Sequence, residues 1–487
     1  MLPKNLELLL SEFRETRGLP SSKPTKKPDT ISSESWLAAI YALRTRDKKF
    51  ISRLLKKGLS EDQVRVFDQL VDWVAAPSEQ RPFFILKGYA GTGKSFLILR
   101  LKTYCEVIYP NLGLLFTAPT NKAVKVIRSM GNEAKTIYSA LKITMSEDED
   151  QMVLSNKPLS NDLGIADGSM LCVDETSWLT KSITSKIVEA QKRLHLKVLF
   201  MGDPAQIGPI QETRSPAWDL AVAPDLGILK KVLRFDNEIL NLTVDVRREI
   251  KKAEKGLPIK SMADLVKPHL GYGSSIRKMS IANNITEFVE NDMAEHKIIA
   301  WRNRTVDEYN RLVRSTLDYK EEFCVGELVM LKSPMTEELY GRKRIVAYTD
   351  DEFKVRAVRD SHVKFDSTFV GSNSIPCFKL QTEELELVVP RSDDTSYDDV
   401  LNKMAQSAKA CSNIKERTAR WKEFWNLRNS FNPVRYGYSQ SAHRSQGSTY
   451  KSVWVDASDI FCNRNLEEKL QCFYVAVSRP TTSLVVT

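Results

Sequence analysis

The sequence contains no C-x-x-C pair, and its cysteines are few and scattered. The seven cysteines stand at positions 105, 172, 324, 377, 411, 462 and 472. Their odd number and irregular spacing argue against both a disulfide framework and a zinc site. The five histidines are equally dispersed. We therefore expect any metal ion to arrive with a substrate.

Long apolar runs are also missing. No run of about 18 apolar residues occurs, which argues against a membrane partner. The N-terminus, MLPKNLELLLSEFRETRG, carries acidic residues among its leucines and lacks the cleavage pattern of a signal peptide. We therefore expect a cytoplasmic protein. The net charge of +10 fits a polyanionic partner such as nucleic acid, and it equally fits a role in solubility.

A chain of 487 residues exceeds what one hydrophobic core organises, so several domains are expected. Residues 1–58 are interpreted as an N-terminal helical extension and linker, because a segment rich in Pro, Ser and Lys separates two helical stretches. Over 59–232, short apolar runs alternate with helical stretches, which predicts buried parallel strands of an α/β domain. Those runs are FFILK, LLFTA, MLCVD and KVLFMGD.

A second α/β domain is predicted at 233–320 and 434–487, with strands at KIIAW, SVWVD and SLVVT. Residues 321–433 break the alternation between helices and parallel strands. Four short runs there, VGELVMLKSP, KRIVAYTD, EFKVRAV and LELVVP, have the character of antiparallel strands, and a charged helical stretch follows them. We interpret 321–433 as a small barrel with helices, inserted into the second α/β domain.

The segment GYAGTGKS matches the phosphate-loop pattern between an apolar strand and an amphipathic helix. Gly88, Gly91 and Gly93 allow a tight loop whose N–H groups converge on phosphate oxygens, with Thr92 between them. The N-terminus of the following helix favours the same anion. Lys94 is predicted to reach the β- and γ-phosphates of ATP, and the hydroxyl of Ser95 to bind Mg²⁺.

Acidic and amide side chains follow two further strands. MLCVDETSW ends a strand at Asp174 and Glu175, where an aspartate can hold Mg²⁺ and a glutamate can deprotonate the attacking water. KVLFMGDPAQ ends another strand at Gly202, Asp203 and Gln206, where an amide can sense the γ-phosphate. Either pattern alone fits a simple strand end, and their spacing after the phosphate loop favours catalysis.

Gln63 has two interpretations. Ser60 and Gln63 fit a capping box at a helix N-terminus, which is a structural role that the local sequence favours. The amide of Gln63 could also recognise adenine by two hydrogen bonds.

Five further segments follow in a fixed order. They are TAPTNKAVKVI (117–127), LRFDNEILNLTVDVR (233–247), AWRNRTVDEYNRLVR (300–314), YSQSAHRSQGST (438–449) and FYVAVSRP (473–480). Taken in order with the phosphate loop, they resemble the motifs of superfamily 1 DNA helicases, in the branch that includes RecD and Dda. The resemblance runs from about residue 59 to the C-terminus.

The resemblance implies two RecA-like motor domains in tandem. A β-hairpin insert is expected near 143–163 in the first, and an SH3-like barrel with a helical tower in the second. Arg234 and Arg479 would be arginine fingers that reach the γ-phosphate, Gly447 would lie at the nucleotide, and Gln63 would recognise adenine. The residues expected at DNA are Pro119, Thr120, Asn121, Tyr138, Asn303, Ser441, His443 and Arg444.

This sequence departs from the family pattern at several points. Tyr138 stands where the family has a histidine, and Ser441 and Arg444 replace threonine and lysine. The hairpin insert offers Met152 and Leu154 where a phenylalanine is expected, which weakens the prediction of strand separation. Three aromatic residues could stack on bases. For Trp178 and Trp301 packing is the favoured role, and for Tyr138 the two roles are balanced.

The resemblance thus implies an ATP-dependent 5′-to-3′ DNA helicase that uses Mg²⁺. It would act as a monomer on single-stranded and fork DNA in phage-type replication or recombination. Single-strand-binding or replisome proteins would be further partners, and a viral protein would act in the host cytoplasm. Alternatives are a translocase that strips proteins from DNA and a non-catalytic DNA-binding subunit. A P-loop kinase is disfavoured, because a kinase needs no second α/β domain with SAHRSQG and YVAVSR.

Overall fold

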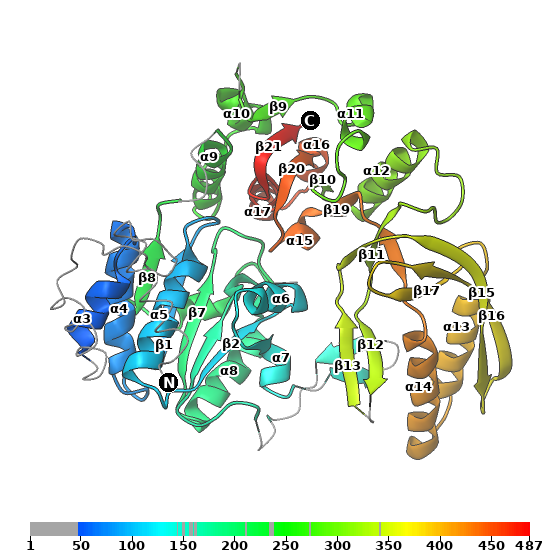
Figure 1. Ribbon diagram of the computed structural model, residues 1–487, viewed down its shortest axis with the longest axis horizontal. Coiled ribbons are helices and arrows are strands. Elements are labelled where there is room, and N and C mark those ends of the chain that lie inside the picture. Colours follow the sequence, from blue (N-terminus) through cyan, green and yellow to red (C-terminus); the bar gives the residue numbers. More distant parts are fainter. Residues whose placement is uncertain are drawn as a thin grey trace, which may run out of the picture.

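A computed structural model of the chain describes residues 47–143, 145–148, 151–154, 159, 163–209, 212–232, 238–271, 274–339 and 342–487. The described chain forms three lobes, with one α/β domain at the lower left, a second at the top and the inserted region at the right (Figure 1). Among the described residues, no helix combines the length and the apolar character needed to cross a membrane.

The first α/β domain is built on a six-stranded sheet in which every neighbouring pair is parallel. Its strands in spatial order are β3 (Ala134–Thr136), β2 (Leu114–Ala118), β6 (Met170–Val173), β7 (Lys197–Gly202), β1 (Phe83–Gly88) and β8 (Leu226–Leu229). Strands β6 and β7 are buried at every position, which explains their continuous apolar sequences. The predicted parallel sheet is confirmed.

Helices cover both faces of this sheet. One core cluster joins the sheet to α3 (Lys48–Leu55), α4 (Glu61–Ala75), α5 (Lys94–Ile108) and α6 (Asn121–Ser129). A second cluster joins the other face to α7 (Ile137–Ala140) and α8 (Lys181–Arg193). Helix α3 belongs to the segment interpreted as an extension, and Ile51 and Leu55 are fully buried in the first cluster.

The hairpin insert consists of β4 (Met145–Asp148) and β5 (Gln151–Leu154), which pair antiparallel. Met152 pairs with Glu147, and Leu154 pairs with Met145. The side chains of Met152 and Leu154 lie outside the described part of the structure, so the prediction about a weak hairpin stays a prediction.

The second α/β domain has a five-stranded parallel sheet. Its spatial order is β19 (Ser439–Ser441), β10 (His296–Ala300), β20 (Tyr450–Val455), β21 (Pro480–Val486) and β9 (Ile276–Lys278). Helices α9 (Glu238–Ala253), α10 (Met262–Val266), α16 (Ala457–Phe461) and α17 (Leu466–Val477) pack in one core cluster. Helices α11 (Ile285–Val289) and α12 (Asn303–Thr316) pack in another. The short helix α15 (Ala442–Ser445) directly follows β19.

The inserted region is a small barrel with a helical pair beside it. The barrel core joins β11 (Leu328–Leu331), β13 (Arg342–Ala347), β14 (Glu352–Lys354), β16 (Gly371–Gln381), β17 (Glu386–Pro390) and β18 (Val434–Tyr436). Strands β12 (Met335–Leu339) and β13 form a hairpin, and β15 (Ala357–Ser367) pairs with β16. The β15–β16 ribbon packs against α13 (Ser396–Lys409) and α14 (Ile414–Asn429). Strand β18 lies just beyond residue 433, the predicted end of the insertion.

One turn of the barrel contacts both α/β domains. This turn comprises residues 348–351. Arg128 and Lys125 of α6 donate to the Tyr348 hydroxyl and to Asp351, each over 3.2 Å. Arg444 of α15 donates to Asp350 over 3.1 Å. The barrel therefore ties α6 of the first domain to α15 of the second.

Candidate active site and nucleic-acid interface

The phosphate loop follows β1 and leads into α5. Gly91 and Gly93 have φ values of 76° and 78°, in the left-handed region that favours glycine. A Cβ at Gly88 would lie 2.7 Å from Cγ of Lys94, so the loop has no room for a side chain there. The Lys94 ammonium donates to the carbonyls of Gly88 and Tyr89, over 2.6 and 3.2 Å. The loop is therefore compact, and Lys94 lies across it.

Two acidic residues at the end of β6 face this loop. The Glu175 amide donates to Asp174 over 2.8 Å, and Glu175 itself has a φ of 50°. Burial raises the pKa of Asp174, although the charge of Lys94 opposes the shift. Burial and the neighbouring Asp174 charge raise the pKa of Glu175 to about 7, while Lys94 and Arg479 oppose this. A carboxylate with a pKa near neutrality suits a general base.

Asp203, at the end of β7, joins the phosphate loop to the second domain. Its Oδ2 accepts from the Ala90 amide over 3.0 Å and from the Tyr474 hydroxyl over 2.6 Å. Its Oδ1 accepts from the Ala205 amide over 2.9 Å. Tyr474 lies on α17 of the second domain, whereas the other residues belong to the first. Asp203 stands at a predicted strand end, whereas its partner Tyr474 was not among the predicted site residues.

Gln206 makes a second contact between the domains. The Gln446 amide Nε2 donates to Gln206 Oε1 over 2.8 Å, and both side chains are buried. Gln446 follows α15, inside the segment that resembles the family's DNA-coupling motif. Gly447, with a φ of 77°, lies next to it, and a Cβ there would be 3.8 Å from Glu175 Oε1. The predicted sensor and this segment are therefore in direct contact.

Arg479 is buried just beyond α17. It donates to the carbonyls of Val475 and Ser448 over 2.9 and 3.1 Å, and to the Ser478 hydroxyl over 2.8 Å. Burial lowers the pKa of Arg479, and the negative charge of Glu175 is the largest opposing influence. The guanidinium of Arg479 is thus close enough to Glu175 for their opposite charges to interact. The other predicted finger, Arg234, lies outside the described residues.

An arginine that was not among the predicted site residues, Arg247 of α9, contacts the phosphate loop. The Arg247 guanidinium lies over the Tyr89 ring, 3.8 Å from its centroid, and only 7% of the residue is exposed. Stacking of a cation on an aromatic face is favourable when both groups are desolvated. Arg247 is the last residue of the motif-like segment 233–247, which also contains Arg234. Its position on the apolar face of the helix, beside Val246 and Ile250, was the available signal.

Gln63 performs the structural role first considered for it. Its Oε1 accepts from the Ser60 amide over 2.9 Å, and the Ser60 hydroxyl accepts from the Gln63 amide, so the capping box at α4 is formed. Its Nε2 donates to the carbonyl of Thr92 over 3.2 Å. Gln63 therefore links the start of α4 to the phosphate loop, and adenine recognition stays a prediction.

A cleft of about 470 Å³ opens between the two α/β domains. Residues of both domains line it, namely Trp178, Ile207, Gly208, Trp301, Arg302, Asn303, Ser441, His443 and Arg444. Asp459 fixes one wall, because its carboxylate accepts from the backbone amides of Trp301 and Arg302 over 2.7 and 2.9 Å. Four predicted DNA contacts (Asn303, Ser441, His443 and Arg444) and two candidate stacking residues (Trp178 and Trp301) therefore line the same cleft.

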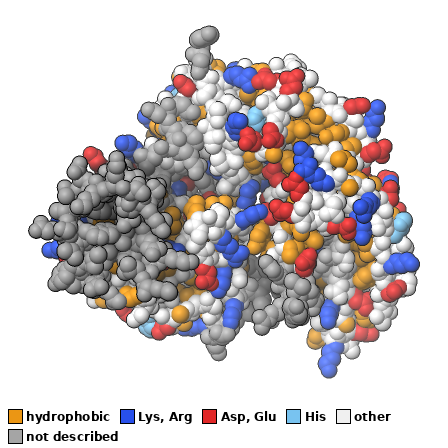
Figure 2. Space-filling model, in the orientation of Figure 1, with side chains coloured by type: hydrophobic (Ala, Val, Ile, Leu, Met, Phe, Trp, Pro, Cys, Tyr) orange, Lys and Arg blue, Asp and Glu red, His pale blue; other side chains and the backbone are white. Residues whose placement is uncertain are grey.

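The remaining predicted DNA residues lie on the first domain and do not line this cleft. Thr120 caps α6 by accepting from the Ala123 amide over 3.2 Å, and Pro119 and Asn121 flank it. Tyr138 is half-buried against the core of the first domain, and burial raises its pKa. On the face shown in Figure 2, blue Lys and Arg side chains alternate with red Asp and Glu side chains. The positive charge of that described surface is therefore dispersed.

Comparisons with known proteins agree with this arrangement. A family model described as an AAA domain matches residues 58–262, and one described as the Dda helicase SH3 domain matches residues 320–436. The ATP-dependent DNA helicase dda of Enterobacteria phage T4 is 24% identical over 455 residues, which cover 86% of this chain and 97% of the phage protein. Together, these matches support a Dda-like helicase of superfamily 1.

Two further proteins match over a similar share of the chain. An uncharacterised protein of Acanthamoeba polyphaga mimivirus is 22% identical over 479 residues, which cover 82% of this chain and 94% of that protein. The crystal structure of the Pif1 helicase from Candida albicans has a TM-score of 0.47 and 17% identity, over 88% of this chain and 94% of that chain. The family match also confirms the predicted SH3-like barrel of the helicase.

Proposed function

We propose that this helicase hydrolyses ATP to move 5′-to-3′ along single-stranded DNA and to unwind duplex at a fork. The T4 relative is named an ATP-dependent DNA helicase, and a Bacteroides Pif1 helicase was crystallised with ADP-AlF3 and single-stranded DNA. We place its action in phage-type replication or recombination, in the host cytoplasm if the source is viral. It would act as a monomer, with single-strand-binding or replisome proteins as further partners.

The observation that carries this proposal is the meeting of the two domains at the phosphate loop. Asp203 binds Ala90 of the loop and Tyr474 of the second domain through one carboxylate oxygen. Gln206 binds Gln446, which lies three residues from His443 in the interdomain cleft. A change at the γ-phosphate would therefore move groups that line the cleft, which is what a translocating motor requires.

The chemistry of the pocket suits phosphoryl transfer to water. In the proposed roles, Glu175 accepts the proton of the attacking water, and Lys94 and Arg479 stabilise charge on the phosphates. Arg247 is added as a further cationic residue, because it reaches the loop from the second domain. Gln206 would sense the γ-phosphate. An arginine supplied by a second domain contributes about 10³- to 10⁵-fold in rate in other phosphate-loop enzymes.

Ser95 and Asp174 fit a hard cation. The hydroxyl of Ser95 at the start of α5 and the carboxylate of Asp174 at the end of β6 offer only oxygen ligands, which Mg²⁺ prefers. When bound with ATP, Mg²⁺ would neutralise charge on the β- and γ-phosphates. In this arrangement Asp174 holds the cation, and Glu175 stays available as the base.

The first test is ATPase activity with and without single-stranded DNA. DNA should increase the rate strongly in the wild-type helicase, and Lys94→Ala and Glu175→Gln should abolish it. The exposed Lys192, on α8 away from the site, gives the matched control Lys192→Ala, which should behave as wild type. Arg247→Ala and Arg234→Ala, measured side by side, identify which arginine of this segment is needed. DNA-independent ATPase activity that survives Lys94→Ala would defeat the proposal.

The second test uses forked duplexes with one single-stranded tail. A duplex with only a 5′ tail should be unwound, and one with only a 3′ tail should not. The reverse result would defeat the assigned polarity. DNA-stimulated ATPase that displaces a bound protein but leaves both duplexes intact would favour the translocase alternative.

A further inference from the structure

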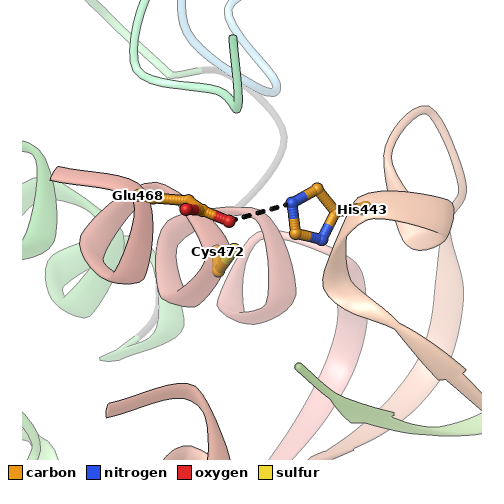
Figure 3. Close-up of side chains that lie close together, drawn as sticks. All are labelled: His443, Glu468 and Cys472. Carbon is orange, nitrogen blue, oxygen red and sulfur yellow. Dashed lines mark ion pairs between the residues drawn. The ribbon is translucent and has the colours of Figure 1, made fainter. Parts of the chain in front are cut away.

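Three side chains of different ligating chemistry meet between α15 and α17 (Figure 3). His443 comes from α15, and Glu468 and Cys472 come from α17. Glu468 and Cys472 are four residues apart, so they lie on the same face of their helix. His443 Nε2 is 3.4 Å from Glu468 Oε1, and all three donor atoms lie within 4.8 Å of one another. The fold thus assembles a cluster that the sequence spacing did not predict.

The geometry points to a site for a borderline divalent transition-metal ion, and we propose Zn²⁺ as its ligand. Zinc bonds of about 2.0–2.3 Å in a tetrahedron separate the donor atoms by roughly 3.3–3.8 Å. The His443–Glu468 separation already fits, and Cys472 needs a shift of about 1 Å or less to bring its sulfur to the upper end of this range. Nitrogen, oxygen and sulfur donors together suit Zn²⁺, whereas Mg²⁺ and Ca²⁺ take oxygen donors.

The cluster borders a cavity through which an ion can enter. A cavity of about 420 Å³ is lined by His443 and Glu468, and also by Glu212, Glu467 and Gln471. Three protein ligands leave the fourth zinc position open towards solvent or another donor. This site differs from the Ser95–Asp174 site proposed for Mg²⁺, both in its ligand chemistry and in its residues.

Metal bound at this site would affect DNA binding, and this part of the inference rests on the proposed function as a DNA helicase. His443 also lines the interdomain cleft with Asn303 and Arg444. If His443 Nε2 bonds to a metal that Glu468 and Cys472 of α17 also hold, this nitrogen cannot contact DNA at the same time. Zinc would therefore lower the affinity for single-stranded DNA.

Cobalt tests the metal site itself, because Co²⁺ replaces Zn²⁺ and gives a charge-transfer absorption band when a thiolate binds it. The wild-type chain should bind one equivalent of Co²⁺ with this band. Cys472→Ala should lose the band, and Glu468→Gln should bind at least tenfold more weakly while its folding is checked by thermal unfolding. The exposed Cys462 provides the control Cys462→Ser, which should keep the band. A wild-type chain without the band, or equal binding by Cys472→Ala, would overturn the site.

Fluorescence anisotropy with single-stranded DNA, in the absence of ATP, tests the consequence. Added Zn²⁺ should weaken wild-type binding at least threefold, and a chelator should restore it. Glu468→Gln should show no such response, and an equal response in that variant would overturn the coupling. A chain with no DNA affinity in either condition would instead contradict the proposed function, while the cobalt spectrum still decides the metal site.

Discussion

Tyr474→Phe removes the hydroxyl that joins the second motor domain to Asp203 and Ala90 of the first. The substitution removes the hydroxyl that donates to Asp203 over 2.6 Å and leaves the buried ring in place. Burial and the Asp203 charge hold the pKa of Tyr474 well above its usual range, so the hydroxyl remains a donor at any assay pH. Asp203 keeps its bonds to the Ala90 and Ala205 amides, so it is not left without partners.

The expected loss follows from the type of bond. A hydrogen bond to a charged group contributes about 1.5–3 kcal/mol. Because this bond joins the domains, its loss should shift the equilibrium between closed and open arrangements by roughly 10- to 150-fold, at about 1.4 kcal/mol per factor of ten. If only the closed arrangement hydrolyses ATP, kcat/KM for ATP should fall by about the same factor.

DNA-stimulated ATPase kinetics measure this loss, and the barrel provides a matched control. The Tyr436 hydroxyl donates over 2.8 Å to the carbonyl of Glu322, a contact remote from the interdomain pocket. Tyr436→Phe should therefore leave kcat/KM unchanged. A double-mutant cycle of Tyr474→Phe with Asp203→Ala should give a coupling energy of about 1.5–3 kcal/mol.

Two results would refute this reasoning. The first is a kcat/KM for Tyr474→Phe within about twofold of wild type, which corresponds to less than about 0.5 kcal/mol. The second is additivity in the cycle, which would mean that the two residues act independently.

Three further predictions concern stability and DNA binding. Burial raises the pKa of Glu175 from 4.5 to about 7, so ionising it in the folded state costs stability as pH rises through this window. Glu175→Gln should therefore raise the Tm in metal-free buffer at about pH 8 but not at about pH 4. The fully buried Lys297 donates to Glu352 over 3.0 Å. Lys297→Ala should therefore lower the free energy of unfolding, measured in urea, by about 3–5 kcal/mol, and Lys297→Met should lower it less. Asp459→Asn should weaken the hydrogen bond that holds the Trp301 backbone amide in the wall of the cleft. The Kd for single-stranded DNA, measured by anisotropy, should therefore rise about threefold to tenfold, and an unchanged Kd would contradict this.

The parts of the site that could be predicted from sequence are those whose determinants are local. The phosphate loop needs only residues 88–95 between a strand and a helix, and Gly91 and Gly93 adopt the left-handed backbone that this requires. The parallel sheets were equally accessible, because buried strands leave continuous apolar runs such as MLCV and KVLFMG.

Contacts between the domains could not be predicted in this way. Gln206 and Gln446 are 240 positions apart, and nothing local to either residue specifies the other. Arg247 was missed for a different reason. The family motif in segment 233–247 predicts Arg234 as the arginine finger, and only the helical periodicity of α9 places Arg247 on the buried face.

The order of strands in the second sheet sets the order in which the chain can fold during synthesis. Strands β9 and β10 are made first, but their partners β19, β20 and β21 all lie after the barrel. At ~5–20 residues per second, the interval of about 140 residues between β10 and β19 lasts roughly 7–30 s. The first sheet is complete by Leu229, so one domain can fold on the ribosome while β10 keeps two unpaired edges. A chain interrupted in the barrel would carry a phosphate loop and no closed second domain, and its exposed strand edges would favour aggregation.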